Sequence, residues 1–308
     1  MPTRNGSIRL FRLLGITVYL HWSWFIIAAI RYQVHSQWHQ YNSPVWYVWE
    51  YLALFLFVLM HEFGHQLACR SVGGKTHDIV LWPFGGVAYV TPPQRPAAQL
   101  WSIVAGPLVN VVLFPILAAL FLFAQSANWA ETMPDVFTFI TMIWLIDTVL
   151  LVFNLLPVYP LDGGQILRSL LWFGLGRERS LMIATVIGFF GIGGLIIFAI
   201  FDQSLWLCAI CVFVLLNCWN GFQQARAMMK VARSPRRADV ACPVCKAAPP
   251  RGAFWICGRC RKPFDTFETQ GICPHCGTQY AATSCPECGS LRPISEWMAP
   301  AIDVPPKL

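Results

Sequence analysis

Two histidines and a glutamate interrupt an apolar stretch of the sequence, LMHEFGHQLA at residues 59–68. His61 and His65 are four residues apart, so on a helix both side chains lie on one face, about one turn apart. The spacing HExxH on a helix is typical of zinc hydrolases, in which the histidines bind Zn2+ and the glutamate, here Glu62, takes a proton from water. The alternative is a pair of hydrogen-bonded histidines at a polar crossing between helices.

A catalytic zinc usually takes a third protein ligand, and the main candidates are His21, Asp147 and Asp162. Counting about 1.5 Å per residue along the apolar runs favours His21 or Asp147, because Asp162 falls beyond the end of its run. Asp162, however, lies in NLLPVYPLDGG, residues 154–164, whose two prolines and paired glycines indicate a broken helix. Irregular backbone at membrane depth would let Asp162 face the histidines, so all three candidates stay open.

The elements that must hold these side chains are helices that cross a membrane. Of 308 residues, 56% are hydrophobic and only 12% are charged, far from the usage of soluble proteins. Apolar runs of about 20 residues, the length that spans a bilayer, recur roughly six times. They lie near residues 13–30, 46–69, 99–124, 136–157, 181–201 and 205–222. The sequence therefore predicts an all-α polytopic membrane protein with about six transmembrane helices.

Basic residues mark one side of these helices. With six spans, one side receives the amino terminus, the loops near 70–98 and 158–180, and the carboxyl tail, which together hold most of the Lys and Arg residues. The positive-inside rule then places both termini in the cytoplasm of a multi-pass cell-membrane protein. A cleaved signal peptide is the alternative for the first run, but His21 interrupts it and no convincing small-residue cleavage site follows.

The loop GGKTHDIVLWPFGGVAYV, residues 73–90, alternates like a strand between paired glycines. This pattern predicts a β-hairpin that dips into the membrane beside the histidines. Its edge could hold a peptide in extended form by β-addition, which exposes the scissile carbonyl. A plain cytoplasmic connector is the alternative, because turns with glycine are common.

The composition changes after residue 225, where Arg and Lys replace the apolar run. We expect four parts, a membrane domain, a basic linker, a small cytoplasmic double zinc ribbon and a carboxyl tail. Their ranges are 1–225, 226–239, 240–290 and 291–308. Over residues 240–308, seven Lys or Arg face five acidic side chains, and zinc-bound thiolates would add negative charge. Nucleic-acid binding is therefore not expected, and a protein partner or a self-regulatory role fits the ribbon better.

Eight cysteines within residues 240–290 form four CxxC pairs, and each foursome suits a closed, tetrahedral structural zinc site. We expect consecutive pairs to share an ion. The first foursome is then Cys242, Cys245, Cys257 and Cys260, and the second is Cys273, Cys276, Cys285 and Cys288. A disulfide scaffold is the alternative, which a reducing cytoplasm disfavours.

Four further cysteines lie in apolar context, where free cysteine behaves as a small hydrophobe, although the last three also share a face that suits a soft metal. These are Cys69, Cys208, Cys211 and Cys218.

The segments HEFGH and NLLPVYPLDGG resemble the site-2 protease family of intramembrane zinc metalloproteases. The resemblance covers most of the membrane domain and includes three more motifs. These are VYLHWSW around His21, WPFGG at 82–86 and AGPLVN at 105–110. It implies hydrolysis of peptide bonds in or near transmembrane segments of membrane-anchored proteins, with one catalytic zinc besides the two of the ribbon.

Carried over to this sequence, the resemblance makes His61, His65 and Asp162 the zinc ligands and Glu62 the general base. The competing function is a non-enzymatic membrane zinc carrier or sensor that uses the same ligands. The glutamate discriminates between the two, because a carrier needs no general base beside its ligands.

Three polar residues are further candidates for substrate binding by this resemblance, Asn154, Asn110 and His21. An amide donor near the metal suits a developing oxyanion, which favours Asn154 for that role. The alternative for each is a hydrogen bond between helices. Asp147 receives no role from the resemblance and is left as an unexplained carboxylate within the membrane.

Overall fold

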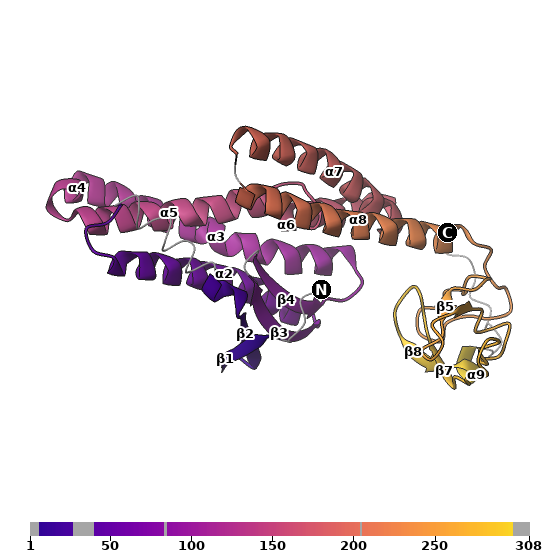
Figure 1. Cartoon of the computed structure of the whole chain (residues 1–308). Helices are drawn as coiled ribbons and strands as arrows, with labels where there is room; N and C mark the ends of the chain where they lie inside the picture. Colours follow the sequence, from indigo (N-terminus) through magenta and orange to yellow (C-terminus); the bar gives the residue numbers. More distant parts are fainter. Residues whose placement is uncertain (1–5, 27–39, 83–84, 204, 298–308) are drawn as a thin grey trace. The chain divides into compact units, whose positions relative to one another are not determined.

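The computed structural model of the chain describes residues 6–26, 40–82, 85–203 and 205–297 (Figure 1). The chain divides into two compact units between Phe222 and Gln223. The first unit contains the long helices and one sheet. The second contains the cysteine pairs.

Five helices among the described residues are long and apolar enough to cross a membrane. They are α2 (Val45–Ser71), α3 (Pro96–Ser126), α5 (Pro134–Leu155), α7 (Arg177–Phe201) and α8 (Leu205–Arg233). Large apolar side chains remain exposed on them, such as Phe190 and Phe201 of α7. Lipid rather than water suits such surfaces, so the chain is a multi-pass membrane protein, and five of the predicted spans are confirmed.

The first predicted span, near residues 13–30, is wrong over its first half. Strand β2 (Ile16–His21) occupies this stretch and pairs antiparallel with β1 (Ser7–Leu13). Its inward residues Ile16 and Val18 are buried in a cluster with α2. A buried strand gives the same apolar signal as a short piece of helix, which is why hydropathy mistook one for the other. The last residues of the predicted span lie outside the described part of the chain.

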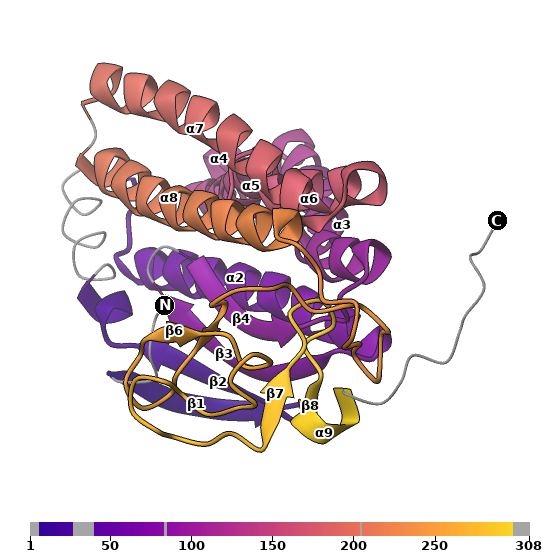
Figure 2. The same cartoon turned by 90° about the vertical axis from the view of Figure 1, so that its right-hand side faces the viewer.

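A four-stranded sheet lies against α2, on the side away from α7 (Figure 1, Figure 2). The hairpin predicted at residues 73–90 is present as β3 (Lys75–Trp82) and β4 (Gly85–Thr91), which pair antiparallel. Strand β2 pairs parallel with β3, and the strand order is β1-β2-β3-β4. The sheet therefore joins the amino-terminal residues to the segment that follows α2.

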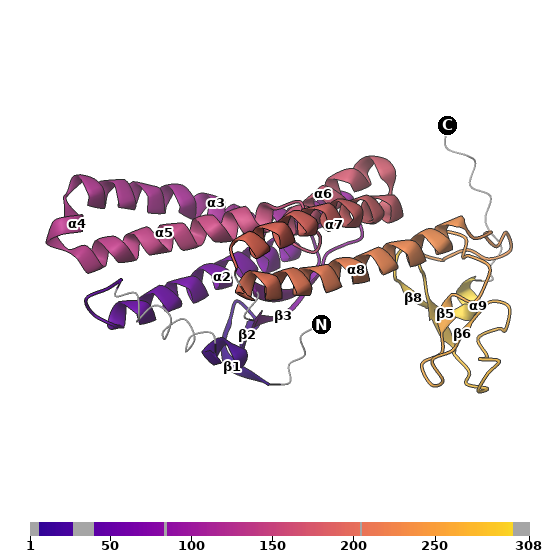
Figure 3. The ribbon, with the colours of Figure 1, turned by 45° about the horizontal axis from the view of Figure 1, so that its top comes forward.

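Helix α3 packs against both α2 and α5, and the short helix α4 (Trp129–Thr132) connects α3 to α5 (Figure 3). The crossing of α2 with α3 depends on a small residue, because a Cβ on Gly64 would lie 2.5 Å from the carbonyl oxygen of Ala105. Helix α5 ends at Leu155, and α6 (Asp162–Leu175) begins after an irregular segment, residues 156–161. The broken helix expected from the prolines is thus present between α5 and α6.

The second unit is built from two small hairpins and a short helix. Strand β5 (Trp255–Ile256) pairs with β6 (Pro263–Phe264), and β7 (Ala282–Ser284) pairs with β8 (Leu291–Pro293), which leads into α9 (Ile294–Trp297). The fully buried Trp297 side chain is part of the main hydrophobic cluster of this unit. A core this small needs further support, which metal ions commonly supply in domains of this size.

A buried carboxylate ties the linker to the cysteine-rich unit. Asp265 Oδ2 accepts hydrogen bonds from Arg237 Nη2 at 2.8 Å and from the Gly252 backbone N–H at 2.7 Å, and Oδ1 accepts from Phe267 N–H at 3.1 Å. Burial alone raises the pKa of the Asp265 carboxyl, but these donors hold it below its usual value. The group is therefore charged at neutral pH and fully partnered.

Replacing Arg237 is expected to loosen this unit, because Arg237→Met leaves the buried Asp265 charge with fewer donors. We expect amide hydrogen exchange of peptides covering residues 250–270 to accelerate by about 10- to 100-fold, the equivalent of about 1–3 kcal/mol. The neighbouring Arg236 is the matched control, since its partner Glu287 is 40% exposed and such pairs contribute little. Equal acceleration in Arg236→Met would contradict the special role of the buried pair.

Candidate active site

Three side chains from two separate helices converge in the first unit. His61 and His65 lie one turn apart on α2, both buried, with their Nε2 atoms 3.1 Å apart. Asp162, the first residue of α6, places Oδ2 2.9 Å from His61 Nε2 and 3.4 Å from His65 Nε2. The structure thus brings together the two histidines of the HExxH motif and the aspartate of the LDGG segment.

These three atoms have the spacing that a zinc ion requires. Zinc binds nitrogen and oxygen at about 2.0–2.1 Å, so two ligands at a tetrahedral angle lie about 3.3 Å apart. The Nδ1 atoms point elsewhere, since His61 Nδ1 lies 2.8 Å from Asn110 Oδ1 and His65 Nδ1 lies 2.8 Å from the Ser102 carbonyl oxygen. Both partners are acceptors, so each Nδ1 carries the proton and each Nε2 has a lone pair for the metal. The donor set fits zinc.

The other two candidates for the third ligand lie elsewhere. The His21 ring stacks on Trp82 of the sheet with centroids 4.6 Å apart, and its Nδ1 contacts the Ser23 hydroxyl. Asp147 is fully buried in α5 and accepts a hydrogen bond from Asn110. Neither belongs to the His61–His65–Asp162 group that could hold an ion among the described residues.

Asp162 reaches the histidines because of the glycines that follow it. A Cβ on Gly163 would overlap the carbonyl of Leu155, and one on Gly164 would overlap the backbone of Tyr159. The first turn of α6 therefore packs directly on the irregular segment that follows α5, a close approach that only glycine permits. Simple counting along a straight helix misses this geometry, which is why depth favoured His21 and Asp147 over Asp162.

Glu62 and Asn154 complete the polar groups of this region that the sequence singled out. Glu62 follows His61 on α2 and is only 6% exposed. Asn154 is half-buried in the last turn of α5, and no hydrogen bond joins its amide to another residue in the described ranges. Asn110, in contrast, has partners at both ends of its amide, His61 and Asp147.

Gly106 of α3 is a residue of the site that sequence reasoning missed. A Cβ at this position would overlap the His65 ring and lie 2.8 Å from His61 Nε2. The backbone of α3 therefore forms the wall behind both imidazoles, and only glycine leaves them room. The motif AGPLVN contains this residue, but its sequence alone does not reveal what faces it.

Gly106→Ala is expected to weaken zinc binding at the histidines by at least about tenfold, because the new methyl group displaces both rings while their Nδ1 hydrogen bonds hold them. Chelator competition on the full chain in detergent measures the loss. Gly193→Ala in α7 is the control, since a Cβ there meets no atom of the described residues within 4 Å. Unchanged zinc affinity in Gly106→Ala would show that α3 does not confine the rings.

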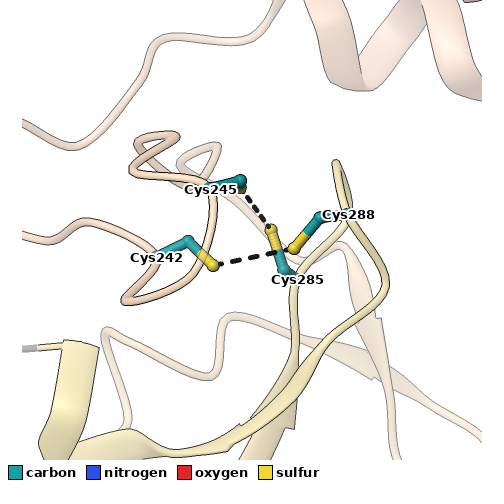
Figure 4. Close-up of side chains that lie close together, drawn as sticks. All are labelled: Cys242, Cys245, Cys285 and Cys288. Carbon is teal, nitrogen blue, oxygen red and sulfur yellow. Dashed lines mark hydrogen bonds between the residues drawn. The ribbon is translucent and has the colours of Figure 1, made fainter. Parts of the chain in front are cut away.

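The eight cysteines of the expected ribbon form two clusters, but their pairing differs from the one expected. The pairs are nested, so the first and last CxxC pairs share one site and the two middle pairs share the other. Figure 4 shows the outer cluster, in which Cys242 Sγ lies 3.8 Å from Cys288 Sγ and Cys245 Sγ lies 3.7 Å from Cys285 Sγ. The inner cluster holds Cys257, Cys260, Cys273 and Cys276. The expectation that consecutive pairs share an ion is therefore wrong.

The nested pairing follows from how the unit closes on itself. Val240 and Trp297 lie in one hydrophobic cluster with Cys242 and Cys285, and the Ala241 N–H donates to the Trp297 carbonyl oxygen at 3.3 Å. These contacts bring the two ends of the unit together and with them the outer cysteine pairs. Closing the longer loop adds little entropic cost, so sequence distance does not decide which pairs meet.

Both cysteine clusters have the spacing of tetrahedral thiolate sites. Zinc binds sulfur at about 2.3 Å, which separates two ligands by about 3.8 Å, and in the inner cluster Cys257 Sγ lies 3.6 Å from Cys276 Sγ. The Cys260 N–H and the Tyr280 hydroxyl lower the pKa of the Cys257 thiol to about 5, so it is a thiolate at neutral pH. The four remaining cysteines belong to neither cluster, nor to any other metal-binding group of the described residues.

The first unit is similar in sequence to known proteins. The family model described as Peptidase family M50 matches residues 49–136 and 127–198. A zinc metalloprotease of Methanocaldococcus jannaschii is 30% identical over 212 residues, covering 68% of this chain and 59% of that protein. A putative zinc metalloprotease of Synechocystis is 32% identical over 238 residues, covering 72% of this chain and 61% of that protein. This chain thus spans about six tenths of the length of these relatives.

A solved structure agrees with these sequence matches. The site-2 protease from Methanocaldococcus jannaschii superimposes with a TM-score of 0.50 and 27% sequence identity, covering 70% of this chain and 95% of that one. The matched region of the family model includes both histidines of α2 and the aspartate of α6. The chain belongs to peptidase family M50, the site-2 protease family.

Proposed function

We propose that this protein is an intramembrane zinc metalloprotease, which hydrolyses peptide bonds in or near transmembrane segments of membrane-anchored proteins. The observation that carries the proposal is the convergence of His61, His65 and Asp162 beside the buried Glu62, in a unit with five apolar helices. The relatives named as zinc metalloproteases support the same reaction.

In this mechanism His61, His65 and Asp162 would hold one catalytic zinc, and Glu62 is the general base. Zinc, when bound, polarises the scissile carbonyl and makes water more acidic. Glu62 takes a proton from the attacking water and delivers it to the leaving amine. Asn154 donates its amide N–H to the developing oxyanion, a role that its lack of a hydrogen-bond partner among the described residues supports. His21 contacts the incoming peptide in this proposal. Its stacking on Trp82, the last residue of β3, supports a position beside the sheet.

The substrate must be extended before it can be cut, because a helical peptide hides its carbonyl groups in internal hydrogen bonds. Strand β4 is at an edge of the four-stranded sheet and pairs only with β3 within that sheet. Its backbone is therefore suited to accept an extended segment of substrate as a further strand.

The proposal extends to the rest of the chain. Residues 240–290 form a double zinc ribbon that binds two structural zinc ions and recognises a protein, after a basic linker at 226–239. Both termini lie in the cytoplasm in this proposal, because the positive-inside rule assigns the basic loops to that side. The pairing of β2 with β3 after α2 and the alternation of five apolar helices support a common side for both ends of the membrane domain. Residues 1–225 then form the membrane domain. Residues 291–308 follow the ribbon as the tail, the first part of which, β8 and α9, packs with the ribbon core.

The competing function is a membrane zinc carrier or sensor with the same ligands. The two are separated by incubating the full chain in detergent with a panel of single-span membrane proteins, with and without a functional Glu62. Zinc-dependent cleavage that requires Glu62 supports the protease. Zinc binding without cleavage of any substrate by either form favours the carrier.

A further inference from the structure

One buried carboxylate of the membrane unit has no role in the mechanism above. Asp147 is 0% exposed in the middle of α5, and its Oδ2 atom has no hydrogen-bond partner among the residues that the structure describes. A carboxylate at this depth costs several kcal/mol to bury and usually marks function. Its Oδ1 atom is linked to the metal site through Asn110. It accepts a hydrogen bond of 2.7 Å from the Asn110 amide, which also contacts His61.

Asp147, Asn110 and His61 form a series of hydrogen bonds, and the chemistry of the three side chains fixes which atom donates in each bond. A carboxylate only accepts, so the NH2 group of Asn110 must face Asp147. The carbonyl oxygen of the same amide then faces His61 Nδ1 at 2.8 Å, and it accepts the Nδ1 proton. His61 is thereby held as the tautomer whose Nε2 lone pair points at Asp162 and His65.

We propose that Asp147 is a positioning residue for the metal site, which orients Asn110 and through it fixes the tautomer and the rotation of His61. This inference rests on the proposed zinc site. It replaces the substrate-binding role considered for Asn110, because both ends of that amide are occupied by Asp147 and His61.

The two histidines need different support. His65 Nδ1 donates to the Ser102 carbonyl oxygen, a backbone group that can only accept and cannot turn around. An asparagine amide, in contrast, can rotate by half a turn and present its NH2 group to His61 Nδ1 instead. That orientation would favour the tautomer with the proton on Nε2, which cannot bind the metal. Asp147 prevents the rotation, since it attracts the NH2 group and repels the oxygen.

The test measures zinc affinity of the full chain in detergent by chelator competition, and the catalytic site is identified as the one lost in His65→Ala. Asp147→Leu is expected to weaken this site by about 10- to 100-fold, the usual effect of losing such a support. Asn110→Leu is expected to do the same, and the two changes together should weaken binding no further than either alone. The two ribbon sites serve as an internal reference, because their affinity should not change.

Two further variants separate positioning from packing. Exchanging the pair, Asn110→Asp with Asp147→Asn, keeps the hydrogen-bonded chain, since the moved carboxylate accepts from His61 and the moved amide donates to it. This double variant is expected to bind zinc within about threefold of wild type, as rescue that mere packing would not give. Thr148→Val in the next position of α5 is the control, because its hydroxyl bonds only to the Trp144 carbonyl of the same helix among the described residues.

The thermal stability of the metal-free chain is the second readout. Leucine leaves the Asn110 NH2 group without its acceptor, but it also removes a buried carboxylate whose Oδ2 has no partner among the described residues. The second effect offsets the first, so stability without zinc should change little. Wild-type affinity in Asp147→Leu, an equal loss in Thr148→Val, or failure of the exchanged pair to bind would overturn the inference. If wild type itself binds no zinc at this site, the proposed function fails, which is a distinguishable result.

Discussion

Glu62→Gln is expected to abolish peptide-bond cleavage while zinc remains bound at His61, His65 and Asp162. Glutamine has nearly the same shape as glutamate but cannot take a proton from water, so only the proton-transfer step is lost. General-base catalysis contributes about 10²- to 10⁴-fold to enzymatic rates, and the cleavage rate should fall by at least the lower figure. The measurement is the initial rate of cleavage of a single-span substrate in detergent, together with zinc content by mass spectrometry.

The control for this substitution is Glu50→Gln on the same helix. Glu50 is also buried, at 3% exposure, and it accepts a hydrogen bond from the Tyr41 hydroxyl at 3.1 Å near the amino end of α2. This variant removes the same charge from α2, about three helical turns away from Glu62, and should cleave at close to the wild-type rate. Equal loss in both variants would mean that the charge stabilises the helix rather than the reaction. Full activity in Glu62→Gln would refute the proposed general base.

Removing two cysteines from one nested site is expected to cost one zinc ion, whereas removing two from different sites costs two. The double variant Cys242→Ser with Cys288→Ser takes both ligands from the outer cluster. We expect the bound zinc to fall from three ions per chain to two, since the inner cluster keeps its four thiolates. Amide hydrogen exchange should show loss of protection around β7 and β8, because binding of structural zinc contributes most of the folding energy of such small domains.

The matched comparison is Cys242→Ser with Cys260→Ser, which takes one ligand from each cluster. Nested pairing predicts that this variant retains only the zinc of the membrane unit. Consecutive pairing predicts the reverse for the two double variants, because Cys242 and Cys260 would then share an ion. The two zinc counts therefore distinguish the arrangements without any assumption about affinity.

The sequence predicted the parts of the site that depend on local geometry. His61 and His65 lie within one helical turn, so their spacing alone places them on one face with Glu62 between them. The position of Asp162 depends on an irregular segment of backbone, and no periodicity describes such a segment. Its prolines and glycines indicated the break, but only the packing of Gly163 on Leu155 explains why Asp162 reaches the histidines.

Contacts between distant parts of the chain were the ones that sequence patterns could not provide. Gly106 and Asn110 face the histidines across a helix crossing, and nothing in their own neighbourhood in the sequence reveals it. The four CxxC pairs resemble each other too closely for spacing to say which ones share an ion. The burial of Trp297 decides their pairing, and it lies beyond the range that the cysteines suggested for the ribbon.

The first strand pair illustrates a different limit, since hydropathy measures burial and not secondary structure. Ile16 and Val18 are apolar because they pack on α2, and a strand satisfies that need as well as a helix does. Alternation over six residues was the signal that distinguished β2, and it was hidden within a longer apolar run.

The nested cysteine clusters also set the order in which a newly made chain can mature. Synthesis proceeds from the amino end, so Cys257 to Cys276 emerge from the ribosome as a complete inner set while the outer set still lacks Cys285 and Cys288. Until those two are made, Cys242 and Cys245 lack the other two cysteines of their site. The time needed to translate from Cys276 to Cys288 is therefore a period in which the outer site cannot yet be completed.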